Sequence, residues 1–114
     1  MLLVDDEPAI LRALATELAE IADVTTAGTV TDALALVAAT SFDMVVADLR
    51  LPDRWGDELL AHVAARSPTT RRVLFTADHD PQRTVRELIA RGVVEEWFQK
   101  PWTDRLVESI RSLN

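Results

Sequence analysis

Short apolar runs alternate with helix-periodic segments along the whole chain, and this alternation limits the fold more than any other feature. Runs typical of strands lie at about 1–4, 23–27, 42–47, 72–75 and 94–98. Between them, apolar residues recur with the three- and four-residue spacing of amphipathic helices. Strands that alternate with helices form a parallel sheet covered by helices on both faces. We therefore expect an α/β, doubly wound fold around a five-stranded parallel sheet.

Local signals mark where the helices begin and end. Pro8 suits the first turn of a helix, where its missing N–H costs no hydrogen bond. Gly92 suits the left-handed residue that ends many helices. The sequence predicts one helix that begins near Pro8 and a second that begins after Gly28. It predicts three more helices at about 57–66, 82–91 and 103–113.

Size and composition exclude several classes of protein. A chain of 114 residues with 48% hydrophobic content suits one domain, residues 1–114, with one core. Zero cysteines and two histidines leave carboxylates as the expected ligands of any metal. A net charge of -7 opposes direct nucleic acid binding. No apolar run is long enough to span a membrane and no signal peptide is evident, so we expect a cytoplasmic domain without membrane contact.

Polar residues follow four of the predicted strands. Asp5 and Asp6 follow the first, Asp48 the third, Thr76 the fourth and Lys100 the fifth. Parallel strands end at the same edge of a sheet, where ligands of open α/β folds bind. The fold is therefore expected to gather these side chains.

The acidic residues predict a divalent cation. Neighbouring carboxylates repel one another by roughly 4 kcal/mol per pair at an effective dielectric near 20. Mg²⁺ offsets such repulsion and leaves room for a phosphate. Lys100 is the only lysine in a chain that otherwise uses arginine, which favours a need for a compact ammonium. The ordinary alternatives are an acidic pair that caps a helix and a threonine that begins a turn.

Four segments together resemble the receiver domain of bacterial two-component response regulators, which has the chemotaxis-regulator-like fold. They are LLVDDE, DMVVADLRLP around Asp48, LFTA around Thr76 and FQKPW around Lys100. The resemblance runs from Met1 to about Leu113. It implies a flavodoxin-like sheet with strand order 2-1-3-4-5.

The resemblance also implies a phosphorelay function. Asp48 would accept a phosphoryl group from a histidine kinase or a histidine phosphotransfer protein, and Thr76 and Lys100 would bind that group. Asp6 and Asp48 would hold Mg²⁺, or Mn²⁺ in its place, with Asp5 acting through metal-bound water and the Arg50 backbone carbonyl completing the protein's ligands. Such a chain is a signalling switch that catalyses its own phosphorylation and dephosphorylation.

The resemblance further implies how the signal leaves the site. Thr76 and Trp97 would move together and remodel the face made by the fourth helix, the fifth strand and the fifth helix. That face would bind an effector outside this chain or form a homodimer, and the first helix would dock the kinase. The peptide bond between Lys100 and Pro101 is expected to be cis.

Departures from the family pattern lie beside Asp48. Arg54 and Trp55 precede Gly56 where aspartate is more usual, and Trp55 is expected to cover part of the site. Arg50 and Asp78 stand two residues beyond Asp48 and Thr76, where the family places modulators of dephosphorylation. They are interpreted either as an ion pair that slows dephosphorylation or as two solvated charges.

Two other classes of protein share part of this pattern. A haloacid-dehalogenase-like phosphatase also forms an aspartyl phosphate, but it needs an acid two residues beyond the nucleophile, where this chain has Arg50. A phosphorylation-independent interaction module usually lacks one of the acidic residues, the threonine or the lysine. All of them are present here.

Overall fold

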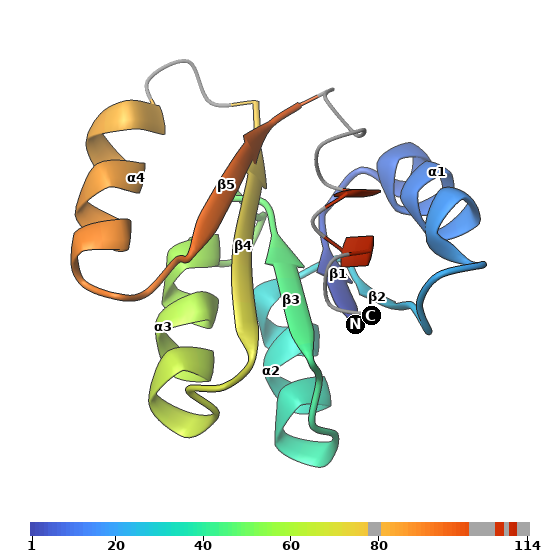
Figure 1. The fold of residues 1–114 in the computed structure, drawn as a ribbon, viewed down its shortest axis with the longest axis horizontal. Helices are drawn as coiled ribbons and strands as arrows, with labels where there is room; N and C mark the ends of the chain where they lie inside the picture. The colour runs from blue at the N-terminus through green and yellow to red at the C-terminus, as the bar shows by residue number, and fades with distance from the viewer. Residues whose placement is uncertain (78–80, 101–106, 109, 112–114) are drawn as a thin grey trace.

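The computed structural model describes residues 1–77, 81–100, 107–108 and 110–111 (Figure 1). Five parallel strands form one sheet in the order β2-β1-β3-β4-β5, which confirms the predicted flavodoxin-like, doubly wound α/β fold. The strands are β1 (Leu2–Val4), β2 (Thr25–Ala27), β3 (Met44–Ala47), β4 (Arg71–Thr76) and β5 (Glu96–Gln99). The helices are α1 (Pro8–Leu18), α2 (Val30–Ala39), α3 (Gly56–Arg66) and α4 (Pro81–Ala90).

Only part of the predicted last helix can be compared with the structure. Val107, Glu108, Ile110 and Arg111 are helical, and the rest of that segment lies outside the described residues. In the part of the chain that is described, no helix is long and apolar enough to cross a membrane.

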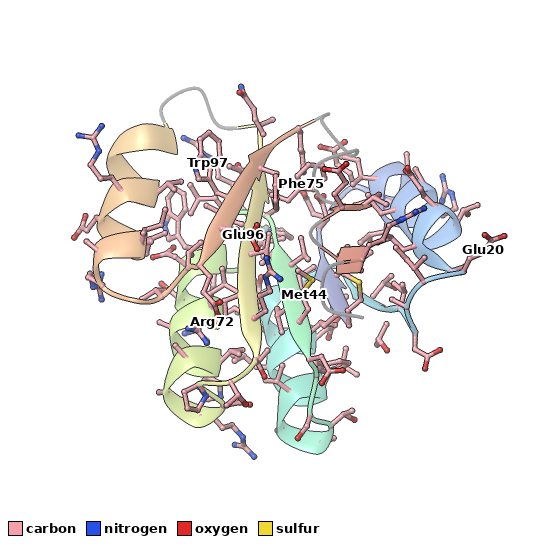
Figure 2. The ribbon with its side chains drawn as sticks, in the orientation of Figure 1. Glu20, Met44, Arg72, Phe75, Glu96 and Trp97 are labelled. Carbon is pink, nitrogen blue, oxygen red and sulfur yellow. The ribbon has the colours of Figure 1, made fainter. Side chains whose placement is uncertain are left out.

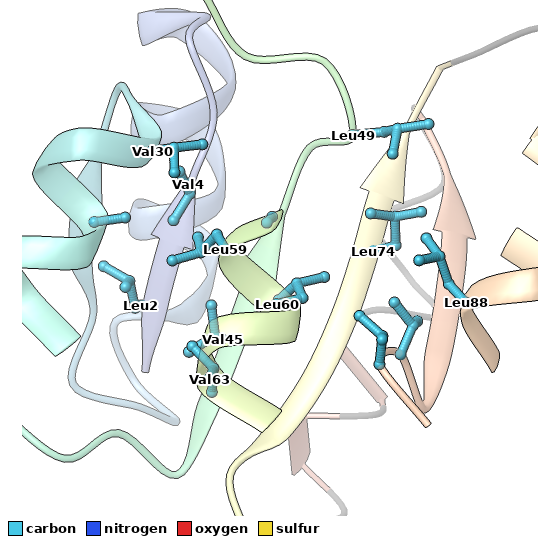
Figure 3. Close-up of a cluster of buried hydrophobic side chains, with 14 of the residues drawn as sticks. Leu2, Val4, Val30, Val45, Leu49, Leu59, Leu60, Val63, Leu74 and Leu88 are labelled. Carbon is cyan, nitrogen blue, oxygen red and sulfur yellow. The ribbon is translucent and has the colours of Figure 1, made fainter. Parts of the chain in front are cut away.

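The sheet has a hydrophobic cluster on each face because alternate residues of a strand point to opposite sides. Leu2 and Val4 belong to the cluster under α2, α3 and α4, which Figure 3 shows in close-up. Leu3, between them in sequence, belongs to the other cluster, together with Leu14 of α1 and Ile110. All residues of β1 and β3 are buried, as expected for central strands covered on both faces.

Two boundaries carry information about the sequence signals. Gly92 has φ +74°, which confirms the predicted left-handed end of α4. The strand predicted at 94–98 instead begins at Glu96. Glu95 N–H donates to the Arg72 carbonyl at 3.0 Å, and the Glu96 carboxylate forms an ion pair with Arg71 on the neighbouring strand. The cross-strand partner therefore lets an acidic residue begin β5.

Candidate functional site

Pairing between adjacent strands places Asp5 beside Asp48. Val4 and Ala47 are register partners in β1 and β3, so the next residue of each strand lies at the same edge of the sheet. Asp48 N–H donates to the Val4 carbonyl at 2.9 Å, which continues the ladder by one residue. The proximity of the two carboxylates thus follows from the register of the strands and does not require a special loop conformation.

The same ladder brings Thr76 and Lys100 to this edge. Thr76 is the last residue of β4, is 1% exposed and has Gln99 as its register partner in β5. Lys100 N–H donates to the Thr76 carbonyl at 2.9 Å. The lysine side chain therefore starts next to the threonine, as the sequence predicts.

The Lys100 ammonium contacts two carboxylates. Its Nζ atom lies 2.5 Å from Asp5 Oδ2 and donates to Asp48 Oδ2 at 2.9 Å. The lysine side chain is 7% exposed, and its Nζ also lies 5.8 Å from the centre of the Phe75 ring. Charge-assisted hydrogen bonds in such a buried environment of low dielectric constant are stronger than the same bonds in water.

Burial and hydrogen bonding act in opposite directions on the charges of this group. Burial lowers the pKa of Lys100, but the hydrogen bonds to Asp5 and Asp48 outweigh it, so the net shift is upward. Burial raises the pKa of the Asp5 carboxyl, although hydrogen bonds from Lys100 and from Glu7 N–H, at 2.9 Å, oppose the rise. We therefore regard Lys100 as a charged ammonium throughout the neutral pH range.

Three carboxylates form a cluster at this edge. One oxygen each from Asp5, Asp6 and Asp48 lies within 4.8 Å of the other two, with Asp6 exposed to solvent. Oxygens on opposite sides of Mg²⁺ are about 4 Å apart, so the cluster fits an ion held directly by some carboxylates and through water by another. Three carboxylates and one ammonium leave two net negative charges, which one divalent cation would neutralise.

The alternative that the acidic pair caps the first helix accounts for only one of the two Asp5 carboxylate oxygens. Asp5 Oδ1 accepts from Glu7 N–H, one residue before α1 begins. Glu7 is itself the N-cap residue of α1, and its own side chain makes no capping hydrogen bond. Asp5 therefore orders the turn into the helix while its other oxygen faces Lys100.

The loop after Asp48 contains a contact that the sequence did not reveal. The Arg50 guanidinium lies 5.6 Å from the centre of the Trp55 ring, and the two residues form an antiparallel bridge. Trp55 is 50% exposed, and Arg50 N–H lies 3.4 Å from Asp48 Oδ1, a long hydrogen bond. Asp78 lies outside the described residues, so its pairing with Arg50 stays a prediction.

Trp97 lies on β5, where its register partner is Leu74 of β4. It is partly buried and packs against the cluster under α2, α3 and α4; Figure 2 shows it on the side of β5 toward α4. Its contacts do not test a role in switching, which stays a prediction. Pro101 lies outside the described residues, so the expected cis bond is not tested either.

Sequence reasoning missed Asp53. Its carboxylate accepts hydrogen bonds from the backbone of Val30 and Thr31, more than twenty residues earlier in the chain. An aspartate after Pro52 indicates a turn, and the sequence carries no signal for such a distant backbone partner.

Comparison with known proteins identifies the family. The model of the response regulator receiver domain matches residues 1–111. The response regulator protein PilR of Pseudomonas aeruginosa is 38% identical over 77 residues, which cover 67% of this chain and 17% of PilR. The chain therefore spans about a sixth of the length of that relative.

Solved structures agree with the family model. The signal receiver domain of an HD domain-containing protein from Pseudomonas fluorescens Pf-5 has a TM-score of 0.87 at 33% identity, covering 97% of this chain and 82% of that one. The response regulator TrrA of Thermotoga maritima, solved in complex with Mg(2+)-BeF, has a TM-score of 0.84 at 27% identity, covering 99% and 96%. The chain belongs to the family of response regulator receiver domains.

Proposed function

We propose that residues 1–114 form one receiver domain that accepts a phosphoryl group on Asp48 in a two-component phosphorelay. The observation that carries this proposal is the Lys100 ammonium, bonded at once to Asp48 and to Asp5 at the strand edge. Asp48, which is 9% exposed, supplies the nucleophile. The buried Lys100 ammonium beside it supplies a positive charge that stabilises the product.

The reaction is a displacement at phosphorus. A carboxylate oxygen of Asp48 attacks the phosphorus of a phosphohistidine on the partner, the P–N bond breaks, and the imidazole nitrogen keeps the electron pair. The product is an aspartyl phosphate, a mixed anhydride that carries one more negative charge than the carboxylate and spreads its charge over the phosphoryl oxygens. Lys100 and the Thr76 hydroxyl donate hydrogen bonds to these oxygens. Water later attacks the same phosphorus, releases inorganic phosphate and restores Asp48.

The acidic cluster is the proposed magnesium site. Asp6 and Asp48 would hold the ion directly, Asp5 would act through water, and the Arg50 backbone carbonyl would be the remaining protein ligand, with Mn²⁺ able to replace Mg²⁺. A bound ion would supply charge neutralisation for the phosphoryl oxygens. The TrrA structure, in complex with Mg(2+)-BeF, supports the choice of metal.

Thr76 and Trp97 are the residues proposed to transmit the phosphorylation signal from the site. Their movement after phosphorylation alters the face of α4, β5 and the last helix, which then binds an effector outside this chain or a second copy. The phosphoryl donor is a histidine kinase or a histidine phosphotransfer protein. The chain thus acts as a switch that modifies itself and not as an enzyme with an external substrate.

Arg50 and Asp78 are the proposed modulators of the phosphoryl lifetime. Arg50 follows Asp48 by two residues, and its guanidinium lies over the Trp55 ring, 5.6 Å from the ring centre. An ion pair with Asp78 would restrict the path of the attacking water. Equal rates of phosphoryl loss in wild type, Arg50→Ala and Asp78→Ala would rule this gate out.

The test of the function is intact mass after incubation with acetyl phosphate and Mg²⁺. Wild type should gain one phosphoryl group, and Asp48→Asn should gain none. Asp43→Asn is the matched control, because Asp43 is an exposed aspartate just before β3, at the opposite end of the same strand. Labelling that persists in Asp48→Asn would contradict the proposal, and repeated turnover of small phosphate esters would favour a phosphatase.

A further inference from the structure

The connection from β3 to α3 starts directly after Asp48 and is closed at its base. Gly56 N–H donates to the Leu49 carbonyl at 2.8 Å, and Arg50 and Trp55 form a backbone bridge. A Cβ atom at position 56 would lie 1.8 Å from the Asp48 carbonyl oxygen. The returning end of the loop therefore rests on the backbone of the proposed phosphoacceptor.

Near its tip the same loop is anchored to α2 by the Asp53 carboxylate. Oδ1 accepts from Val30 N–H at 2.9 Å, and Oδ2 accepts from Thr31 N–H at 2.8 Å and from the Thr31 hydroxyl at 2.6 Å. These amides belong to the first turn of α2, whose N–H groups have no partner within the helix. The hydrogen bond from the Thr31 hydroxyl is the largest cause of a lowered pKa at Asp53, so the anchor is an ionised carboxylate.

A second residue, Thr29, also caps the same helix. The Thr29 hydroxyl accepts from Asp32 N–H at 3.0 Å. The first turn of α2 is therefore satisfied from two sources, Thr29 within its own segment and Asp53 from the loop after Asp48. This division allows the role of the loop anchor to be separated from the stability of the helix.

We propose that Asp53 is a positioning residue for the cation site. Arg50, whose backbone carbonyl is the proposed metal ligand, precedes Asp53 by three residues in a loop held at its base and near its tip. Without the anchor, this segment would have to lose conformational freedom each time the ion binds, which weakens binding. The inference rests on the proposed function, because it concerns the same magnesium site.

The coupling between the Asp53 anchor and metal binding is reciprocal. If the anchor favours metal binding, metal binding must favour the anchored arrangement by the same factor. Mg²⁺ should therefore slow hydrogen exchange at the amides of Val30 and Thr31, although these residues are not proposed ligands. In Asp53→Ala, Mg²⁺ should leave the exchange of both amides unchanged.

Calorimetric titration with MgCl₂ tests the inference in wild type, Asp53→Ala and Thr29→Ala. Asp53→Ala should weaken Mg²⁺ binding roughly tenfold, at the lower end of what outer partners of metal sites contribute. Thr29→Ala should stay within about twofold of wild type, although it also removes a cap of α2. Asp53→Asn, which keeps one acceptor oxygen, should lie between wild type and Asp53→Ala and serves if the alanine variant does not fold.

The outcomes separate the two proposals. Equal Mg²⁺ affinity in wild type and Asp53→Ala, or equal weakening in Asp53→Ala and Thr29→Ala, would overturn the role of Asp53 while the metal site stands. Wild-type protein that binds no Mg²⁺ would overturn the proposed function and this inference with it.

Discussion

The side-chain nitrogen of Lys100 and Oδ2 of Asp48 lie 2.9 Å apart, although 52 residues separate them in the chain. The same nitrogen lies 2.5 Å from Asp5 Oδ2. An ammonium is compact enough to sit between two carboxylates, whereas a guanidinium presents a planar fork that suits one carboxylate from the side. This geometry explains why the only lysine of the chain stands at this position.

Lys100→Met should destabilise the metal-free protein by about 3 kcal/mol, because it leaves two buried carboxylates without their partner. The pKa of Lys100 is raised, so its stabilising effect is complete below the ordinary lysine pKa and is lost only as pH rises through the higher folded value. Urea unfolding in EDTA at neutral pH measures the loss. Arg12→Met, which removes an exposed cation from α1, should change the unfolding free energy little. Equal losses of unfolding free energy in the two variants would contradict the stabilising role of Lys100.

Asp6→Asn should have opposite effects with and without metal. In EDTA it removes one of three clustered negative charges, and the free energy of unfolding should rise by less than about 1 kcal/mol because Asp6 is exposed. In Mg²⁺ the variant should lose the stabilisation that ligand binding gives the wild type. Unfolding midpoints with EDTA and with MgCl₂ measure both effects. Glu7→Gln, which neutralises the adjacent exposed acid outside the cluster, should keep the Mg²⁺ response.

Gly56→Ala should be strongly destabilising, by about 3 kcal/mol, because its Cβ would lie 1.8 Å from the Asp48 carbonyl oxygen and the backbone must move. The shift should also slow labelling of Asp48 by acetyl phosphate. Gly28→Ala is the matched control, since its nearest contact would be the Asp5 carbonyl oxygen at 4.0 Å, an ordinary distance. Urea unfolding of both variants measures the difference. Similar midpoints for the two would show that the loop tolerates a Cβ at position 56.

The parts of this structure that follow from periodicity could be predicted from the sequence. Alternating strands and helices fix which residues end the strands, and parallel pairing then brings Asp48 and Lys100 to one edge. The contacts of Asp53 could not be predicted in this way. Its partners are backbone N–H groups, which nearly every residue carries, so no residue type marks them in the sequence. The start of β5 was misplaced for a similar reason, because the Arg71 partner of Glu96 appears only once the strands are paired.

The stability that Asp53 contributes should depend on pH in a direction that its pKa fixes. Its folded pKa lies below the ordinary aspartate value of 3.8, with the Thr31 hydroxyl as the largest cause. A lowered pKa gives stability that is complete above the ordinary value and is lost as pH falls toward the folded value. The difference in urea midpoint between wild type and Asp53→Ala should therefore stay constant from about pH 8 to pH 5 and narrow below about pH 4. Thr29→Ala removes a neutral cap from the same helix, so its difference from wild type should not change across this range. If the difference in urea midpoint between wild type and Asp53→Ala did not narrow in acid, the carboxylate would act through its shape and not through its charge.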